Sequence, residues 1–286
     1  MTSERSAPAS SDLSTDYGRF LARKCAALAG LAGLLVVGLL VAITLGAADL
    51  SINEVLSALF GRAHARRIDL IVWQIRLPRA LAACCAGAGL AGAGAAMQAI
   101  LRNPLGSPFT LGISHAAAFG AALSVMLLGG GTMDSAHTQA MHITAPGLTT
   151  AAAFACSLVA TGIIMAISHV RGAGPHVMVL AGVALGALFT AGTMLLQFFA
   201  DDVQLAAMVF WTFGDTARAS WRELGVMAAV TLAAGGYFLA RGWHYNALDA
   251  GEETARGLGV AVGRTRLVGM LAASLATAVI IAFLGI

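Results

Sequence analysis

Two polar motifs, Arg76-Leu77-Pro78-Arg79 and Arg102-Asn103-Pro104-Leu105, bound a stretch that contains no charged residue. The first motif brings two guanidinium groups three residues apart, a spacing that a helix places on one face, and its proline suits the first turn of a helix. The second contains an Asn-Pro pair, which ends a helix. The 22 residues between them, 80–101, would extend roughly 33 Å as a helix, enough to cross a bilayer core of about 30 Å.

Catalytic chemistry is not supported by the residues expected at membrane depth. They include no aspartate pair, no His-Glu zinc pattern and no lysine that could form a Schiff base. No GxxxxGK[ST] motif occurs, and Lys24, the only lysine, lies outside any glycine-rich loop. The chain is therefore not expected to bind ATP through a P-loop, and any transport would need a partner that supplies the energy.

Seven stretches of the chain contain no Asp, Glu, Lys or Arg, although the chain has 17 basic and 14 acidic residues. A charged residue at the centre of a membrane helix costs about 2.5–3.5 kcal/mol, so this exclusion indicates membrane spans. The composition agrees, with 58% hydrophobic and 11% charged residues. We predict an all-α polytopic transmembrane bundle with seven spans, 25–45, 80–101, 110–129, 148–168, 177–199, 224–240 and 267–286.

Residues 1–24 are polar and rich in serine, and we expect them to form a disordered cytoplasmic N-terminus. They end in Arg19, Arg23 and Lys24, directly before the first apolar window, which favours an N-terminus on the cytoplasmic side. A cleaved signal peptide is the alternative, but 21 apolar residues exceed the usual core of about 7–15.

Other features of the windows concern packing. Gly182 and Gly186 form a GxxxG pattern, which favours close helix packing, with a dimer contact as the alternative. Residues 203–213 are too short to span and follow Asp201-Asp202, so we expect a short helix at the outer face with an aspartate cap. The four cysteines show no CxxC spacing and are expected to be packing residues, not disulfides or metal ligands; they are Cys25, Cys84, Cys85 and Cys156.

Several segments, in order along the chain, resemble the permease subunit of ABC importers for iron–siderophore complexes, haem and vitamin B12. The segments are 72–79 (Val-Trp-Gln-Ile-Arg-Leu-Pro-Arg), 87–90 (Gly-Ala-Gly-Leu), 97–98 (Met-Gln), 102–108 (Arg-Asn-Pro-Leu-Gly-Ser-Pro), 111–114 (Leu-Gly-Ile-Ser), 180–186 (Leu-Ala-Gly-Val-Ala-Leu-Gly) and 251–260 (Gly-Glu-Glu-Thr-Ala-Arg-Gly-Leu-Gly-Val). Each segment alone is weak, but their order along residues 25–286 is specific.

The resemblance implies a homodimer or pseudo-dimer of ten-helix permeases. A periplasmic or lipoprotein substrate-binding protein would dock outside, and two ATPase subunits would dock inside. The substrate would pass between the two permease copies. Membrane lipid is the other expected contact, while no cofactor, metal or nucleic acid is expected. The implied location is the bacterial cytoplasmic (inner) membrane.

The resemblance also implies roles for individual residues. Arg76 and Arg79 match outer-face arginines that contact acidic residues of the binding protein, with snorkelling anchors as the alternative. Residues 249–259 match the loop that contacts the ATPase, in which two acids would open a short helix and glycines would close it; an ordinary solvated loop is the alternative. The coupling residues would be Glu252, Glu253, Thr254, Arg256, Gly257, Leu258 and Gly259. The turn near the inner gate would contain Asn103, Pro104 and Pro108.

The chain departs from the family pattern in three places. His115 stands where the family usually has a small or amide residue, so it is either a titratable group near the pathway or a hydrogen-bonded packing histidine. An outer connection gathers residues that could bind haem or a soft metal, or that occur there by chance; they are Met133, His137, Met141 and His142. The sequence ends at Ile286 after seven expected spans instead of ten, so we expect 25–286 to be a C-terminally incomplete permease domain.

These observations predict the membrane-spanning subunit of a binding-protein-dependent ABC importer for a metal chelate, either an iron–siderophore complex, haem or cobalamin. The subunit would not be an enzyme, because ATP hydrolysis belongs to a separate ATPase. The alternative is a truncated, non-transporting remnant that acts at most as an assembly or regulatory partner. An intramembrane enzyme is disfavoured by the distribution of charges.

Overall fold

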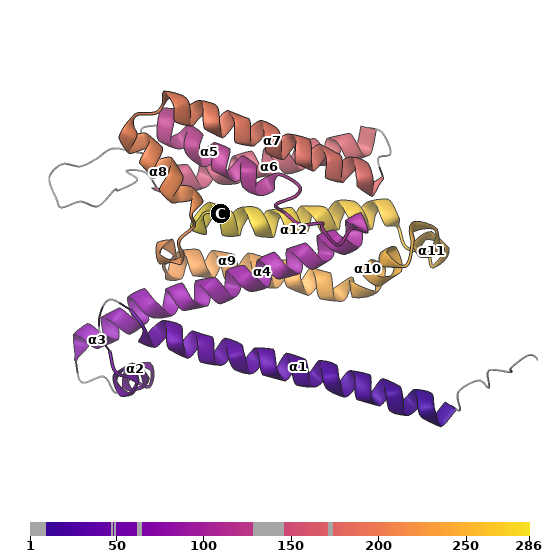
Figure 1. The fold of residues 1–286 in the computed structure, drawn as a ribbon, viewed down its shortest axis with the longest axis horizontal. Helices are drawn as coiled ribbons and strands as arrows, with labels where there is room; N and C mark the ends of the chain where they lie inside the picture. Colours follow the sequence, from indigo (N-terminus) through magenta and orange to yellow (C-terminus); the bar gives the residue numbers. More distant parts are fainter. Residues whose placement is uncertain (1–9, 47, 49, 62–64, 128–145, 171–173) are drawn as a thin grey trace, which may run out of the picture. The chain divides into compact units, whose positions relative to one another are not determined.

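The computed structural model describes residues 10–46, 48, 50–61, 65–127, 146–170 and 174–286. All regular secondary structure within these ranges is helical (Figure 1). The chain divides into two compact units, residues 1–80 and 81–286. The all-α fold class predicted from the sequence is confirmed.

The first unit holds the helices α1 (Ser10–Thr44), α2 (Ile52–Leu59) and α3 (Arg66–Leu70), the π-helix η1 (Ile71–Arg76) and the start of α4 (Leu77–Leu101). Because α1 begins at Ser10, the expected disorder of residues 1–24 is wrong for residues 10–24, which are helical.

Pro78 does not open a helix, contrary to the expectation, because α3 and η1 run directly into α4. A proline inside a helix cannot donate a backbone hydrogen bond, and its ring presses on the carbonyl four residues earlier. The wider turn of η1 lies immediately before it, where the Leu77 N–H donates to the Val72 carbonyl five residues back. A π turn of this kind accommodates a proline without ending the helix.

The second unit contains most of α4 and all the later helices. These are α5 (Ile113–Leu127), α6 (Pro146–Val170), α7 (Pro175–Phe199), α8 (Asp202–Thr212), the 3₁₀ turn η2 (Thr216–Arg218), α9 (Trp221–Ala240), α10 (Gly242–Asp249), α11 (Glu252–Gly257) and α12 (Val262–Leu284). The short helix predicted after Asp201 is α8, and its cap is confirmed, since the Asp201 carboxylate accepts from the Gln204 N–H at 2.7 Å.

Six helices in the described part of the chain are long and apolar enough to cross a membrane. They correspond to six of the seven predicted spans. The remaining window, 110–129, contains α5, whose 15 described residues extend about 22 Å; residues 128–129 of this window lie outside the described residues. The sequence did not reveal that α5 begins only at Ile113, because the residues before it are largely apolar yet form turns.

Helix α12 is central to the second unit, with 67% of its most apolar window buried. It packs against α5 and α6 on one side and α9 on the other (Figure 1). Its buried positions are mostly small residues, including Gly269, Ala273 and Thr277. Small side chains let helices approach closely in a membrane, where no hydrophobic force drives their association.

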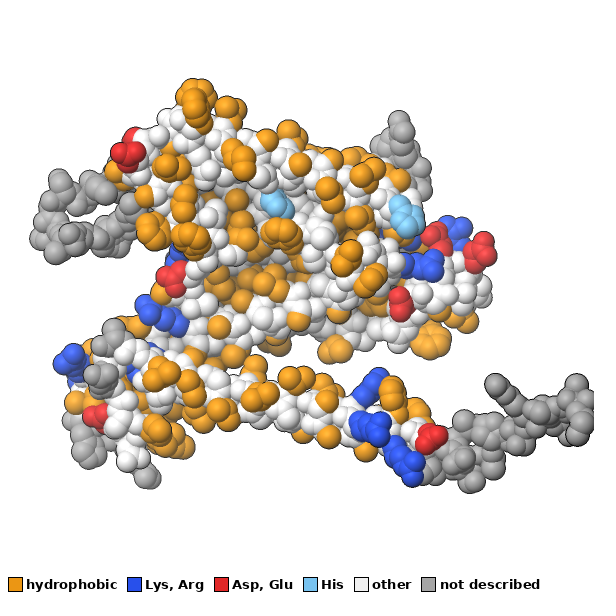
Figure 2. Space-filling model, in the orientation of Figure 1, with side chains coloured by type: hydrophobic (Ala, Val, Ile, Leu, Met, Phe, Trp, Pro, Cys, Tyr) orange, Lys and Arg blue, Asp and Glu red, His pale blue; other side chains and the backbone are white. Residues whose placement is uncertain are grey.

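On the face that Figure 2 shows, the second unit is apolar over much of its helix length, while charged side chains lie at its ends and gather most densely around α10 and α11. On α7, for example, the exposed side chains include Leu180, Leu188 and Phe198. Exposed aliphatic rows of this extent suit contact with lipid chains.

Candidate coupling site and the arginine motif

The predicted coupling segment forms a short, well-ended helix, α11. Glu252 and Glu253 occupy its first turn, where acids face the positive end of the helix dipole. At the other end, the Val260 N–H donates to the Ala255 carbonyl at 2.9 Å and the Gly259 N–H donates to the Arg256 carbonyl at 3.0 Å. These two bonds form a Schellman motif, with Gly259 in the left-handed region at φ +79°.

Glu252 links α11 to the central helix α12. One carboxylate oxygen accepts from Arg256 at 2.7 Å within α11, and the other accepts from Arg266 of α12 at 3.2 Å. The Arg266 side chain is only 11% exposed. The hydrogen bond from Arg266 is the main cause that holds the pKa of Glu252 below its ordinary value of 4.5. The carboxylate is therefore charged and paired near neutral pH.

The two faces of the coupling segment differ in exposure. Ala255 is fully buried against the bundle, whereas Glu253, Thr254 and Arg256 are exposed. Leu258 directly follows the helix. It is a large apolar residue that lies outside the predicted spans, yet it is 55% exposed. A partner could therefore contact the outer face without disturbing the packing of the inner one.

The predicted inner-gate turn lies between α4 and α5. Its first part closes α4 with a second Schellman motif, in which the Asn103 N–H donates to the Gln98 carbonyl at 3.2 Å. Arg102 takes the left-handed position at φ +48°, where glycine is usual. The Asn103 side chain accepts from the Leu105 N–H at 2.9 Å, and the Gln98 amide donates to the Pro104 carbonyl at 3.0 Å.

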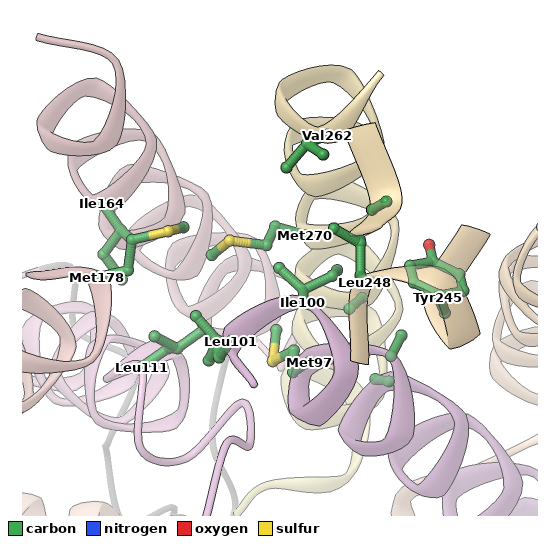
Figure 3. Close-up of a cluster of buried hydrophobic side chains, with 14 of the residues drawn as sticks. Met97, Ile100, Leu101, Leu111, Ile164, Met178, Tyr245, Leu248, Val262 and Met270 are labelled. Carbon is green, nitrogen blue, oxygen red and sulfur yellow. The ribbon is translucent and has the colours of Figure 1, made fainter. Parts of the chain in front are cut away.

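One apolar cluster packs beneath both the turn and the coupling segment (Figure 3). Leu101 and Leu111 enter it from either side of the turn, Ala255 from α11, and Met270 from α12. The structure thus brings together two motifs that are about 150 residues apart in sequence. Pro108 is buried in the same turn, whereas Pro104 is exposed.

The arginine motif has a different geometry from the predicted one. Arg79 is exposed, whereas Arg76 is only 7% exposed. Its guanidinium donates to the carbonyls of Ile43 at 2.9 Å and Thr44 at 2.7 Å, and to that of Ala48. Arg76 therefore satisfies carbonyls at the C-terminal end of α1 and in the segment that follows it, and the expectation that both arginines lie on one exposed face is wrong.

The π turn explains part of this difference, because residues 71–76 do not follow the 3.6-residue period on which the prediction depended. Sequence reasoning also missed Arg266. It lies 14 residues from Glu252, in a separate helix, so no local spacing relates the two.

His115 is a half-buried packing residue beside α7. Its ring lies 4.5 Å from that of Phe109, centroid to centroid. No hydrogen bond to its buried Nδ1 occurs in the described part of the chain, so the hydrogen-bonded interpretation is not supported for this atom. A methyl group on Gly186 would lie 3.3 Å from the His115 Nδ1, and a methyl group on Gly182 would lie 2.7 Å from the Leu111 Cα. The GxxxG pattern therefore packs α7 against the 110–115 segment of the same chain.

An apolar cavity of about 660 Å³ lies within the second unit. It is bordered by Leu90 and Gly94 of α4, Pro108 of the turn, and Thr277 and Ile281 of α12. The cluster Met133, His137, Met141 and His142 lies outside the described residues.

Comparison with known proteins places this geometry in a family. The profile of the FecCD transport family matches residues 34–286. The chain belongs to this family. A Methanocaldococcus jannaschii protein named as an ABC transporter permease is 53% identical over 245 residues, covering 86% of this chain and 69% of that protein.

Two FecCD relatives with named substrates are more distant. The ferric enterobactin transport system permease of Escherichia coli is 34% identical over 278 residues, covering 94% of this chain and 78% of its own length. The molybdate import system permease of Haemophilus influenzae is 30% identical over 244 residues, covering 84% of this chain and 68% of that protein.

A solved structure, described as an inward-facing conformation of a metal-chelate type ABC transporter, has the same fold. Its TM-score to this chain is 0.73, with 27% sequence identity, and the match covers 91% of this chain and 76% of that one. The chain is therefore a multi-pass membrane protein of the ABC permease type, as the sequence predicted.

Proposed function

We propose that this FecCD permease is the membrane-spanning subunit of an importer for a metal chelate, such as an iron–siderophore complex, haem or cobalamin. The relatives named for ferric enterobactin and the metal-chelate type structure support this substrate class. The molybdate relative shows that the family also serves a small oxyanion.

The observation that carries the coupling proposal is the link between α11 and α12. The Glu252–Arg266 pair and the buried Ala255 fix the inner side of α11 to the most buried helix of the unit. A displacement of the outer face of α11 is therefore transmitted to α12 and is not absorbed by a flexible loop. Glu252 acts in this proposal as a tether, and the partner contacts would come from Glu253, Arg256 and Leu258.

The partner that supplies this force would be an ATPase, two copies of which would serve two permease copies. A binding protein would dock at the opposite membrane face, where the exposed Arg79 offers a positive charge. The basic residues before the first span, Arg19, Arg23 and Lys24, support an N-terminus in the cytoplasm and insertion in the cytoplasmic membrane.

The proposal is tested by co-purification of the cognate ATPase with the permease, alongside uptake in vesicles. Leu258→Asp places a charge on the exposed contact face and leaves the Glu252–Arg266 pair unchanged. We expect about tenfold less ATPase to be retained, with uptake lost and membrane insertion normal. The control is Phe60→Asp, an exposed apolar position that follows α2 (76% exposed, against 55% for Leu258), and this variant should retain the ATPase.

Two results would count against the proposal. Wild-type retention and uptake in Leu258→Asp would reject α11 as the coupling element. A wild-type chain that neither retains an ATPase nor supports uptake would reject the importer function itself.

A further inference from the structure

A basic pocket of about 320 Å³ opens where the spanning helix α9 ends and the spanning helix α12 begins. Arg241, His244 and Arg264 line it, together with Tyr237 and Thr265. None of the described residues that line it is acidic, and neither arginine has an ion pair within the described part of the chain. The pocket therefore gathers positive charge that the surrounding residues do not neutralise.

Two further features favour an anion in this pocket. The N-terminus of α12 opens at Ala261, which also lines the pocket, and no side chain caps it. An uncapped helix N-terminus of this length presents free N–H groups and the positive end of its dipole. In addition, the buried Nδ1 of His244 has no hydrogen-bond partner among the described residues, while its Nε2 lies 3.4 Å from Arg241.

We propose that this pocket binds the phosphate headgroup of an anionic phospholipid. Its position favours lipid, because α9 ends at Ala240 and α12 begins at Val262, which places the pocket at the headgroup level of a spanning bundle. Near the pocket-lining residues in sequence, Leu239 of α9 is 85% exposed and Trp243 of α10 is 67% exposed, as expected for side chains that contact acyl chains and the interface. The phosphate would accept from Arg241, Arg264 and the first N–H groups of α12.

The test measures binding of fluorescent phosphatidylglycerol and phosphatidylcholine to the full chain in dodecyl maltoside micelles. The wild type should prefer phosphatidylglycerol. Arg241→Gln combined with Arg264→Gln should weaken phosphatidylglycerol binding about 30-fold, since each arginine near an anionic headgroup contributes about fivefold. Arg19→Gln combined with Arg23→Gln removes the same charge from exposed positions of α1 and should change binding less than about threefold.

A second variant keeps both arginines. Ala261→Asp supplies a carboxylate at the N-cap of α12, which would occupy the site from within. We expect it to lose the preference for phosphatidylglycerol while raising the midpoint of thermal unfolding, so the loss cannot be attributed to misfolding.

Three outcomes would overturn the proposal. The first is an unchanged lipid preference in the double arginine variant. The second is displacement of phosphatidylglycerol by inorganic phosphate at millimolar concentration, which would identify a site for the free anion. The third is a wild type without lipid preference whose double variant loses the ATPase, which would mean that the pocket binds acidic side chains of that partner.

Discussion

Replacing Arg76 by methionine should loosen the C-terminal end of α1, because three backbone carbonyls lose their donor at once. The carbonyl of Ile43 belongs to a buried residue, whereas Thr44 and Ala48 are half-buried. An unsatisfied buried acceptor costs about 1–3 kcal/mol, and a partly solvated one costs less. We therefore expect about 3 kcal/mol of local destabilisation, which is roughly a 150-fold increase in local opening.

Hydrogen exchange in detergent measures this opening directly. The amides of Ile43, Thr44 and Leu45 should exchange on the order of 100-fold faster in Arg76→Met. Arg79→Met is the matched control, because that side chain is exposed, and its effect should stay within about 0.5 kcal/mol.

A second substitution sharpens the same prediction. A methyl group on Gly46 would lie 2.9 Å from an Arg76 nitrogen. Gly46→Ala should therefore disturb α1 in the wild type but much less in Arg76→Met, a coupling that a double-mutant cycle detects. Equal protection of α1 in Arg76→Met and Arg79→Met would refute the capping role and restore Arg76 as a candidate for docking.

Two further predictions concern the coupling site and the turn. Because the pKa of Glu252 is held below 4.5, the Glu252–Arg266 pair should be fully formed above pH 4.5 and lost as the pH falls through the lowered pKa. A nitroxide attached at Thr254→Cys, in a background without the native cysteines, should gain mobility only in that acidic range. If a Glu252→Gln variant were equally sensitive to acid, the pairing would be contradicted. Because Arg102 adopts φ +48°, Arg102→Gly should stabilise the fold by about 0.5 kcal/mol and slightly raise the midpoint of thermal unfolding, whereas Arg102→Val should lower it. A lower midpoint for the glycine variant would contradict the left-handed conformation of this residue.

Local patterns predicted the elements that depend on local physics. The exclusion of charge located the spans, because the cost of a charge in lipid acts on each helix separately. Asp201 before an apolar run predicted the cap of α8, and the acid and glycine positions around 251–260 predicted both ends of α11. Each of these signals is complete within about ten residues.

The features that sequence reasoning missed depend on contacts between distant segments. Arg76 was expected to be exposed, because nothing near it in sequence indicates that the end of α1 lacks donors for its carbonyls. The late start of α5, at Ile113, has a similar cause. The residues before Ile113 are apolar enough to be helical, but the close approach of Leu111 and Gly112 to Gly182 and Gly186 holds them in turns.

The shared core beneath α11 and the α4–α5 turn gives a physical reason for two separate motifs to act together. Leu101 and Leu111 flank the turn, and both belong to the cluster that buries Ala255 of α11. A close-packed cluster of this kind transmits displacement instead of absorbing it, because it has few voids into which side chains can move. If an ATPase displaces α11, the cluster and the Glu252–Arg266 pair both carry that displacement to α12, and the cluster alone carries it to the turn. The turn also borders the apolar cavity through Pro108, so a movement that begins at an exposed helix reaches the cavity through contacts that are all visible in the structure.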